Sequence, residues 1–264
     1  KRLITEASNA GADVVKFQTF KTNSIATPSA EKANYQKLNT KNNSNQIEML
    51  NKLELRDEEF VELSNHCKKN KIEFLSTAFD PESLDMLISL GIKRIKVPSG
   101  EITNFPFLKK IGSKNLPIIL STGMSTLGEI EDALNLLLNS GSLRKNITVL
   151  HCTSEYPAPY GAINLRAMNL IKNAFNVKIG YSDHTLGIEV SLAAVALGAK
   201  IIEKHITLDK NSYGPDHKAS LEPKEFANMV KGIRIIEKSL GKESKIPSKK
   251  ELANSLLVRK SIVA

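Results

Sequence analysis

Charged and hydroxyl side chains recur in this sequence where short apolar runs end. Lys16 and Gln18 stand two residues apart in the first such run, and Lys96 lies within a later one. Other runs close on Ser76-Thr77, Ser99-Gly100-Glu101, Ser121-Thr122-Gly123-Met124, His151-Cys152-Thr153-Ser154, Ser182-Asp183-His184-Thr185 and Glu203-Lys204-His205. If these groups converge, their ammonium and hydroxyl donors suit a small anion that carries phosphate and carboxylate. One hydroxyl at a strand end often only satisfies a loop backbone, but its repetition in five successive runs favours a binding site.

Two histidines end neighbouring apolar runs, at His184 and His205. A single histidine is usually a hydrogen-bonded core group, but two at neighbouring strand ends could both face one divalent cation. With no third Cys or His nearby, the pair indicates an exchangeable Mn²⁺ or Mg²⁺ site rather than structural zinc. Of the other histidines, His151 is expected to orient neighbouring groups, and His217 lies in a loop where substrate contacts are plausible.

The elements that must position these groups alternate along the chain. Apolar, β-branched runs predict strands at 14–17, 74–76, 95–97, 118–121, 147–150, 178–181 and 201–203. Helical periodicity lies between them, at 57–69, 81–90, 126–138, 165–175, 187–197 and 223–240. Asp80 before Pro81, and Ser125 before Glu129, are typical of helix starts. Alternating strands and helices indicate βα units and a parallel sheet.

The number of predicted strands points to a (β/α)8 TIM barrel. Leu3, Ile4 and Ala7 have helical spacing, so the chain opens within a helix that a strand should precede. Seven predicted strands and that one make eight, and we expect the first strand to be missing from this chain. In such a barrel the carboxyl ends of the strands carry the site, which is where the polar residues above collect.

The domain organisation follows from two irregular regions. Residues 1–241 are predicted to form the barrel, within which the long stretch 21–51 is a functional excursion. After Gly241 the composition changes to that of a linker, and residues 255–264 turn apolar, as if a further element begins. We therefore separate 242–264 from the barrel.

Composition narrows the classes of protein. Lys and Arg number 37 against 28 Asp and Glu, a net charge of +9, but the positive residues are scattered and lack interleaved aromatic residues. A nucleic-acid face is therefore not expected. No apolar run approaches the roughly 18–20 residues of a membrane span. The two cysteines show no pairing pattern, which is typical of a reducing cytoplasm, and Cys67 falls on the apolar stripe of its helix.

Several of these motifs together resemble the sialic acid (N-acetylneuraminate) synthase family. They are Val15-Lys16-Phe17-Gln18, Ser99-Gly100-Glu101, Ser121-Thr122-Gly123-Met124, His151 to Pro157, Tyr181 to Thr185 and Glu203 to Asp209, in order over residues 1–240. The resemblance implies a barrel enzyme that condenses phosphoenolpyruvate with an N-acetylmannosamine-type sugar and releases phosphate, using Mn²⁺ or Mg²⁺. It also implies a homodimer, and a small antifreeze-like domain of which 242–264 would hold only the linker and the start.

The same resemblance implies roles for matching positions. Phosphoenolpyruvate would meet Lys16, Thr77, Lys96, Ser99, Ser121, Ser154 and Ser182, and the sugar would meet Gln18, Glu101, Tyr156 and Asp216. His184 and His205 match the metal pair, and Lys16, Lys96 and Glu101 the catalytic groups. Some members carry Asn where this chain has Ser154. The family's Asn-His-Asn-Gly loop and a Glu on its first strand would precede Lys1.

Alternatives remain at this stage. Within the family, the acceptor could be N-acetylmannosamine or the 2,4-diacetamido-2,4,6-trideoxymannose that leads to legionaminic acid, toward which the run from Val97 to Asn104 leans. A Schiff-base aldolase on the same barrel would use Lys16 or Lys96 as a covalent nucleophile. A binding module without catalysis, for nucleic acid, is the alternative from another class.

Overall fold

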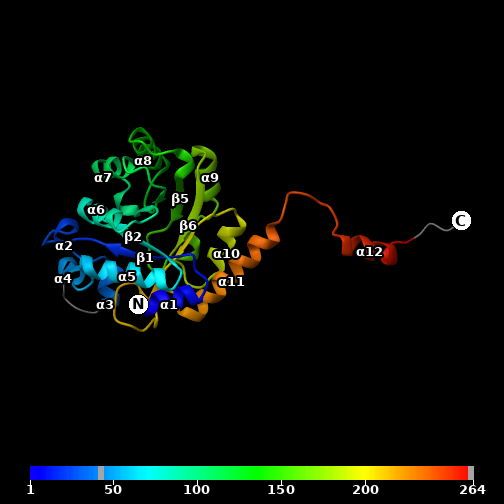
Figure 1. Cartoon of the computed structure of the whole chain (residues 1–264), viewed down its shortest axis with the longest axis horizontal. Coiled ribbons are helices and arrows are strands. Elements are labelled where there is room, and N and C mark those ends of the chain that lie inside the picture. Colours follow the sequence, from blue (N-terminus) through cyan, green and yellow to red (C-terminus); the bar gives the residue numbers. More distant parts are fainter. Residues whose placement is uncertain (41–44, 261–264) are drawn as a thin grey trace.

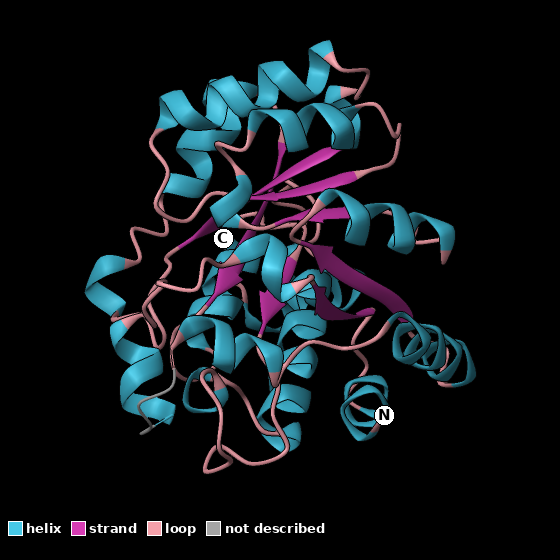
Figure 2. Cartoon of the chain, turned by 90° about the vertical axis from the view of Figure 1, so that its left-hand side faces the viewer, coloured by secondary structure: helices cyan, strands magenta, loops and turns pink. Residues whose placement is uncertain are grey.

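The computed structural model describes residues 1–40 and 45–260, and its centre is one parallel sheet. The seven strands pair in chain order, and every pairing is parallel. They are β1 (Val14–Thr19), β2 (Glu73–Ala78), β3 (Ile95–Val97), β4 (Ile118–Ser121), β5 (Ile147–Cys152), β6 (Lys178–Asp183) and β7 (Ile202–Lys204). Figure 2 shows the strands at the centre with helices around them. The prediction of a TIM-barrel sheet that lacks one strand is confirmed.

Helices connect the strands and form the outer layer. Before β2 they are α1 (Arg2–Asn9), α2 (Thr22–Ile25), α3 (Asn34–Thr40), α4 (Gln46–Asn51) and α5 (Asp57–Lys69). Those that follow are α6 (Pro81–Ser89), α7 (Phe105–Gly112), α8 (Leu127–Asn139), α9 (Ala167–Phe175), α10 (Glu189–Ala196), α11 (Pro223–Leu240) and α12 (Lys249–Val258). Sequence periodicity predicted six of these, together with the opening helix α1.

The remaining helices differ from the sequence prediction for local reasons. α7, which has Pro106 in its first turn, was not among the predicted helices. The 21–51 excursion contains the short helices α2, α3 and α4, although its residues 41–44 lie outside the described part. The N-cap of α8 is Thr126 rather than Ser125, because Thr126 and Glu129 form a reciprocal capping box.

Three apolar clusters hold the described part of the barrel together. The largest fills the space between sheet and helices, and it includes Cys67, which is buried as predicted. A small one lies inside the sheet, where Leu75, Ile119 and Leu150 meet, and another packs α11 through Leu221, Phe226 and Met229. Gly180 permits this inner packing, because a Cβ there would stand 2.5 Å from both Leu150 Cδ2 and the Ile201 carbonyl oxygen. The barrel is therefore closed at its base by side chains.

Strand alternation then places the polar residues above that apolar base. Residues two apart point to the same face of a strand, so Lys16 follows Val14 and Thr77 follows Leu75 on the inside. The same step puts Ser121 above Ile119, and Glu203 above Ile201. Two residues further along their strands, at the mouth of the barrel, lie Gln18, His184 and His205. The sheet itself therefore builds a polar chamber from inward-facing residues.

The C-terminal segment extends away from the barrel (Figure 1). α12 begins at Lys249, earlier than the apolar residues suggested, because Ser248 and Glu251 form a capping box. Leu256 and Leu257 are 86% and 85% exposed. Residues 261–264, the end of the predicted apolar segment, lie outside the described residues. Among the helices of the described chain, none combines the length and the hydropathy needed to cross a membrane.

Candidate active site

Two lysines and a set of hydroxyls meet inside the barrel. Lys96 on β3 is 3% exposed, and its ammonium group donates a hydrogen bond of 2.7 Å to Ser121 Oγ on β4. Lys16 on β1 reaches Thr77 Oγ1 on β2 at 3.4 Å. Thr77 is in register with Lys96, so these four residues form a continuous band over β1 to β4. They are the groups that the sequence predicted for phosphoenolpyruvate.

Glu203 lies between the two lysines and balances their charge. Its Oε1 is 3.7 Å from Lys16 Nζ, and its Oε2 is 3.8 Å from Lys96 Nζ. Burial alone would raise the pKa of this carboxyl, but Lys16 and Lys96 outweigh burial and lower it to about 2. Glu203 is therefore ionised, and its charge favours the protonated form of Lys96.

Burial sets the proton affinity of Lys96. It lowers the pKa of this group from 10.5 to about 8, with Glu203 opposing the shift and Lys16 adding to it. Lys96 is thus cationic at neutral pH while holding its proton less tightly than an exposed lysine. An anion that entered the chamber would meet two positive charges with little competing water.

A glycine opens space beside two predicted hydroxyls. Gly123, in the loop after β4, donates its backbone N–H to Ser99 Oγ at 2.9 Å. A Cβ on Gly123 would stand 2.2 Å from Ser154 Oγ and 2.9 Å from Ser99 Oγ. The three residues therefore form a narrow cradle whose width requires glycine.

Ser182 and Cys152 complete the chamber on the side of β5 and β6. Ser182 Oγ donates to Glu203 Oε1 at 3.3 Å. Burial raises the pKa of the Cys152 thiol, an effect that Ser182 and Ser99 beside it oppose. All seven residues predicted to bind phosphoenolpyruvate thus belong to one linked group.

The two histidines of the predicted metal pair lie next to each other. Their ring centroids are 5.4 Å apart, with the ring planes at 81°. His184 Nδ1 lies 2.7 Å from the Thr153 carbonyl oxygen, which can only accept, so Nδ1 carries the proton and Nε2 keeps its lone pair. Burial lowers the pKa of both rings, that of His205 to about 3, where His184 and Lys16 add to the effect. Both imidazoles are neutral, the form that binds metals.

The donor set fits a labile cation. In the described part of the chain, no cluster of three or more His, Cys, Asp or Glu is suitable for a metal. If the two neutral imidazoles hold a divalent cation, water or substrate oxygens must complete its coordination, which Mn²⁺ and Mg²⁺ accept and a closed zinc site does not.

Aromatic rings line the mouth beside the histidines. Tyr156 packs on His184 with ring centroids 4.2 Å apart, and Tyr35 stacks on Tyr156 at 5.1 Å. Asp216 lies across the mouth, with Oδ2 3.7 Å from His205 Nδ1, while its buried Oδ1 has no hydrogen-bond partner in the described structure. A buried acceptor without a partner indicates where a ligand donor belongs.

The other predicted residues are less connected. Gln18 is exposed at the end of β1, and Glu101 accepts from Asn104 Nδ2 at 2.7 Å in its own loop. Within the described residues neither bonds to the rest of the predicted site. His151 is part of β5, with its side chain on the outer face of the sheet, where Nε2 lies 2.6 Å from the Ile163 carbonyl oxygen. His217 Nδ1 lies 2.7 Å from Thr207 Oγ1.

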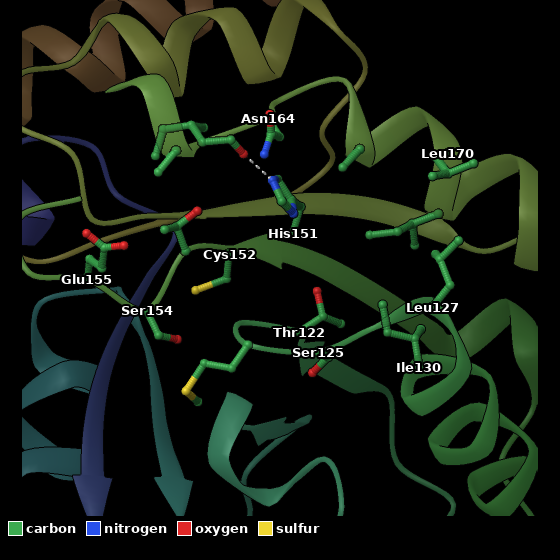
Figure 3. A pocket seen from close by; sticks show the side chains of 16 residues that line it. Thr122, Ser125, Leu127, Ile130, His151, Cys152, Ser154, Glu155, Asn164 and Leu170 are labelled. Carbon is green, nitrogen blue, oxygen red and sulfur yellow. Dashed lines mark hydrogen bonds between the residues drawn. The ribbon is translucent and has the colours of Figure 1, made fainter. Parts of the chain in front are cut away.

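His151 belongs to a separate cavity of about 410 Å³ that adjoins the chamber. Its walls come from the loops after β4 and β5 and from α8 and α9. Figure 3 shows Ser154 and Cys152 at one side of this cavity and Leu127, Ile130 and Leu170 at the other. Most of the predicted site residues lie outside it, within the barrel.

Sequence reasoning missed two contributors to the site. Glu203 stood in a quoted motif without a role, although an acidic residue two before a strand-end histidine must share its inward face. Tyr35 comes from α3 in the excursion, where no local pattern marks it. Asn39 Nδ2, also on α3, donates to the Pro215 carbonyl oxygen at 2.6 Å and ties this helix to the loop that carries Asp216.

Comparisons with known proteins agree with this geometry. A model described as the NeuB family matches residues 3–245. The chain is 56% identical to the N,N'-diacetyllegionaminic acid synthase of Campylobacter jejuni, covering all of this chain and 79% of that protein. It is 50% identical to the synthase of the same name from Legionella pneumophila, covering 99% and 74%.

A solved structure shows the same fold. The N-acetylneuraminic acid (sialic acid) synthetase of Leptospira borgpetersenii, in complex with citrate, superposes with a TM-score of 0.84 at 33% identity. The match covers 98% of this chain and 86% of that one.

Proposed function

The chain belongs to the NeuB family, and from that membership we propose that it is a nonulosonic acid synthase that condenses phosphoenolpyruvate with a 2-acetamido sugar and releases phosphate. The observation that carries the proposal is the polar chamber, in which Lys16 and Lys96 meet inward-facing hydroxyls beside a neutral histidine pair. Relatives named as legionaminic acid and sialic acid synthases support the reaction class.

The lysines and hydroxyls act by holding the anion. Lys16 and Lys96 neutralise the phosphate and carboxylate, and Ser121, Thr77 and Ser182 donate hydrogen bonds that fix the orientation. The enol carbon C3 of phosphoenolpyruvate then attacks the aldehyde of the open-chain sugar. Water adds at C2, and phosphate leaves with cleavage of its bond to carbon. The chamber supplies positive charge at the leaving group throughout.

The histidine pair is proposed to hold Mn²⁺ or Mg²⁺. His184 would contribute Nε2, since its Nδ1 is committed to the Thr153 carbonyl oxygen. A cation bound there supplies Lewis-acid polarisation of the acceptor aldehyde. The chain's own part is to keep both imidazoles neutral and next to each other.

The acceptor we favour is 2,4-diacetamido-2,4,6-trideoxymannose rather than N-acetylmannosamine. The relatives at 56% and 50% identity, both named N,N'-diacetyllegionaminic acid synthase, support it. The stacked Tyr35 and Tyr156 offer apolar surface of the kind that acetamido methyl groups and a deoxygenated carbon bury. Homodimer formation and a cytoplasmic location stay predictions.

Phosphate release tests the proposal directly. The chain is incubated with Mn²⁺, phosphoenolpyruvate and each acceptor, with mannose as the control that lacks an acetamido group. We expect release to require both substrates and to be fastest with the diacetamido sugar, and calorimetry to show phosphoenolpyruvate binding without an acceptor. Absence of that binding in a folded sample would contradict the proposal.

One further treatment separates the Schiff-base alternative, which the lowered pKa of Lys96 makes worth testing. Borohydride with pyruvate should leave the mass of the chain unchanged. A stable adduct on Lys16 or Lys96 would instead favour the aldolase.

A further inference from the structure

A buried ion pair lies directly behind the two candidate metal-binding histidines. Lys204 Nζ is 3.0 Å from Asp183 Oδ2, and both side chains are 0% exposed. Asp183 immediately precedes His184, and Lys204 immediately precedes His205. The two residues are also in register across β6 and β7. The pair therefore cross-links the last positions of the strands that present the histidines.

The pair lies on the outer face of the sheet, away from the chamber. Successive side chains of a strand point to opposite faces, so Ser182 and His184 face inward while Asp183 faces outward. Ser191 in α10 confirms this direction, since its Oγ donates to Asp183 Oδ2 at 2.6 Å. The pair therefore reaches the histidines through the backbone and through the field of its two charges, and its side chains do not enter the chamber.

Every acceptor site of Asp183 is used locally. Its Oδ1 accepts from the backbone N–H of Thr185 at 2.9 Å and from Thr185 Oγ1 at 2.7 Å. Lys204 also donates to the Thr185 carbonyl oxygen. His184 is therefore held on both sides, because residues 183 and 185 are hydrogen-bonded to each other and to the residue that precedes His205.

A buried ion pair adds little net free energy to the stability of a fold. Removing two charges from water offsets much of their attraction, and apolar side chains of similar volume often stabilise a fold equally well. What the charges add is directional hydrogen bonding, which apolar packing does not provide. Each member of the pair immediately precedes a histidine. Its directional hydrogen bonds therefore act on the backbone that carries the two imidazoles.

We propose that Asp183 and Lys204 are positioning residues that fix the separation and orientation of His184 and His205 for one divalent cation. The proposal rests on the proposed function, since it assumes that the histidines hold a metal. It assigns the pair no contact with substrate or metal.

The test compares Mn²⁺ affinity in matched variants of the whole chain. The double variant Asp183→Asn/Lys204→Met removes both charges without leaving one unpaired, and the asparagine retains a carbonyl acceptor for Thr185. We expect Mn²⁺ binding, followed by the loss of its free-ion electron paramagnetic resonance signal, to weaken at least tenfold. Phosphoenolpyruvate affinity should stay within twofold, because the anion chamber uses other residues.

A second ion pair provides the control. Arg94 and Glu73 make two hydrogen bonds of 2.8 Å near the amino ends of β3 and β2. The histidines lie at the carboxyl ends of β6 and β7, at the opposite end of the barrel. The double variant Glu73→Gln/Arg94→Met should leave Mn²⁺ affinity unchanged, whatever it does to the thermal midpoint. This control separates positioning from a general loss of stability.

Each outcome decides between the proposals. Absence of Mn²⁺ binding to the unmodified chain would contradict the proposed metal pair itself. Binding to the unmodified chain and equally to the folded Asp183→Asn/Lys204→Met variant would overturn the positioning role alone. If that variant does not fold, Ser191→Ala, which removes one hydrogen bond from Asp183, should still weaken Mn²⁺ binding severalfold. Unchanged affinity in folded Ser191→Ala would then overturn the proposal.

Discussion

At the scale of single residues, the chamber balances charge rather than accumulating it. Glu203 is within 4 Å of two ammonium groups, so its carboxylate partly neutralises their positive charge when no anion is bound. The carboxylate favours the protonated state of Lys96, which burial disfavours. An incoming anion therefore finds Lys96 already charged, at the cost of some repulsion from Glu203.

Anion binding should weaken in mild alkali because of Lys96. Its pKa of about 8 lies below 10.5, and the anion requires the protonated form, so affinity is lost as pH rises through that value. From the titration alone, phosphoenolpyruvate should bind roughly tenfold more weakly at pH 9 than at pH 7. Calorimetry over this range, with circular dichroism to confirm folding, measures the effect. A constant affinity would show that Lys96 does not contribute its charge.

A methyl group in the cradle should block the anion without unfolding the chain. In Gly123→Ala the new Cβ would displace Ser154 Oγ and Ser99 Oγ, both of which can rotate, and would stand 3.3 Å from Ser99 Cβ, which a small shift of the loop relieves. We expect phosphoenolpyruvate affinity to fall at least about tenfold, roughly 1.4 kcal/mol, with little change in thermal midpoint. The matched control is Gly100→Ala in the neighbouring loop, where a Cβ meets nothing within 4 Å. Equal affinities in the two variants would argue against the cradle.

At the scale of elements, the excursion after β1 takes part in the site. α3 is tied to the loop that carries Asp216, and it brings Tyr35 onto Tyr156. Burial, with the nearby Asp216 carboxylate, raises the pKa of the Tyr35 phenol. The phenol is therefore neutral. It lies near Asp216 Oδ1, the buried oxygen without a hydrogen-bond partner in the described structure, on the side of the chamber where we place the sugar.

Loss of the Tyr35 ring should affect the sugar more than the anion. In Tyr35→Ala we expect KM for the acceptor to rise about tenfold, since an aromatic contact of this size contributes on the order of 1 kcal/mol beyond its buried area. KM for phosphoenolpyruvate should stay within twofold. Leu38→Ala is the control, because Leu38 lies on the same helix with 71% of its side chain exposed. Equal rises in both KM values would indicate disruption of α3 instead.

An element could be predicted from the sequence where the residue pattern that specifies it lies within a few neighbouring positions. The strands β2 to β6 are almost entirely buried on both faces, so each appears as an apolar run, and the capping of α6 by Asp80 can be recognised within four residues. The band of Lys16, Thr77, Lys96 and Ser121 could be predicted because alternation and parallel register are general rules. Tyr35 could not, since its position depends on how an irregular excursion folds back over the mouth.

At the scale of the whole molecule, the barrel and the C-terminal segment differ in how they are held. Three apolar clusters stabilise the described part of the barrel, and its first and last helical regions meet where Arg234 in α11 contacts Asp13 at 2.7 and 2.8 Å. The residues of α12 are exposed apart from Ser255, which is partly buried. A helix of ten residues has little stability of its own in water.

Limited proteolysis should therefore separate the two parts without damage to the site. Trypsin should cut first in the exposed segment after Gly241, at Lys242 or Lys245, before any lysine of the barrel. Because the described contacts of α12 lie within its own segment, the trimmed product should keep its thermal midpoint within about 2 °C, a difference of less than roughly 1 kcal/mol.

Phosphoenolpyruvate binding provides the second readout of this cleavage. Lys16, Lys96 and their hydroxyl partners all precede the cut, so the affinity should be unchanged, as calorimetry on the purified product would measure. Loss of affinity on cleavage would mean that 242–260 supports the chamber through contacts that form in solution. Intact mass places the cut, and so decides whether the barrel domain ends at Gly241 as its composition indicates.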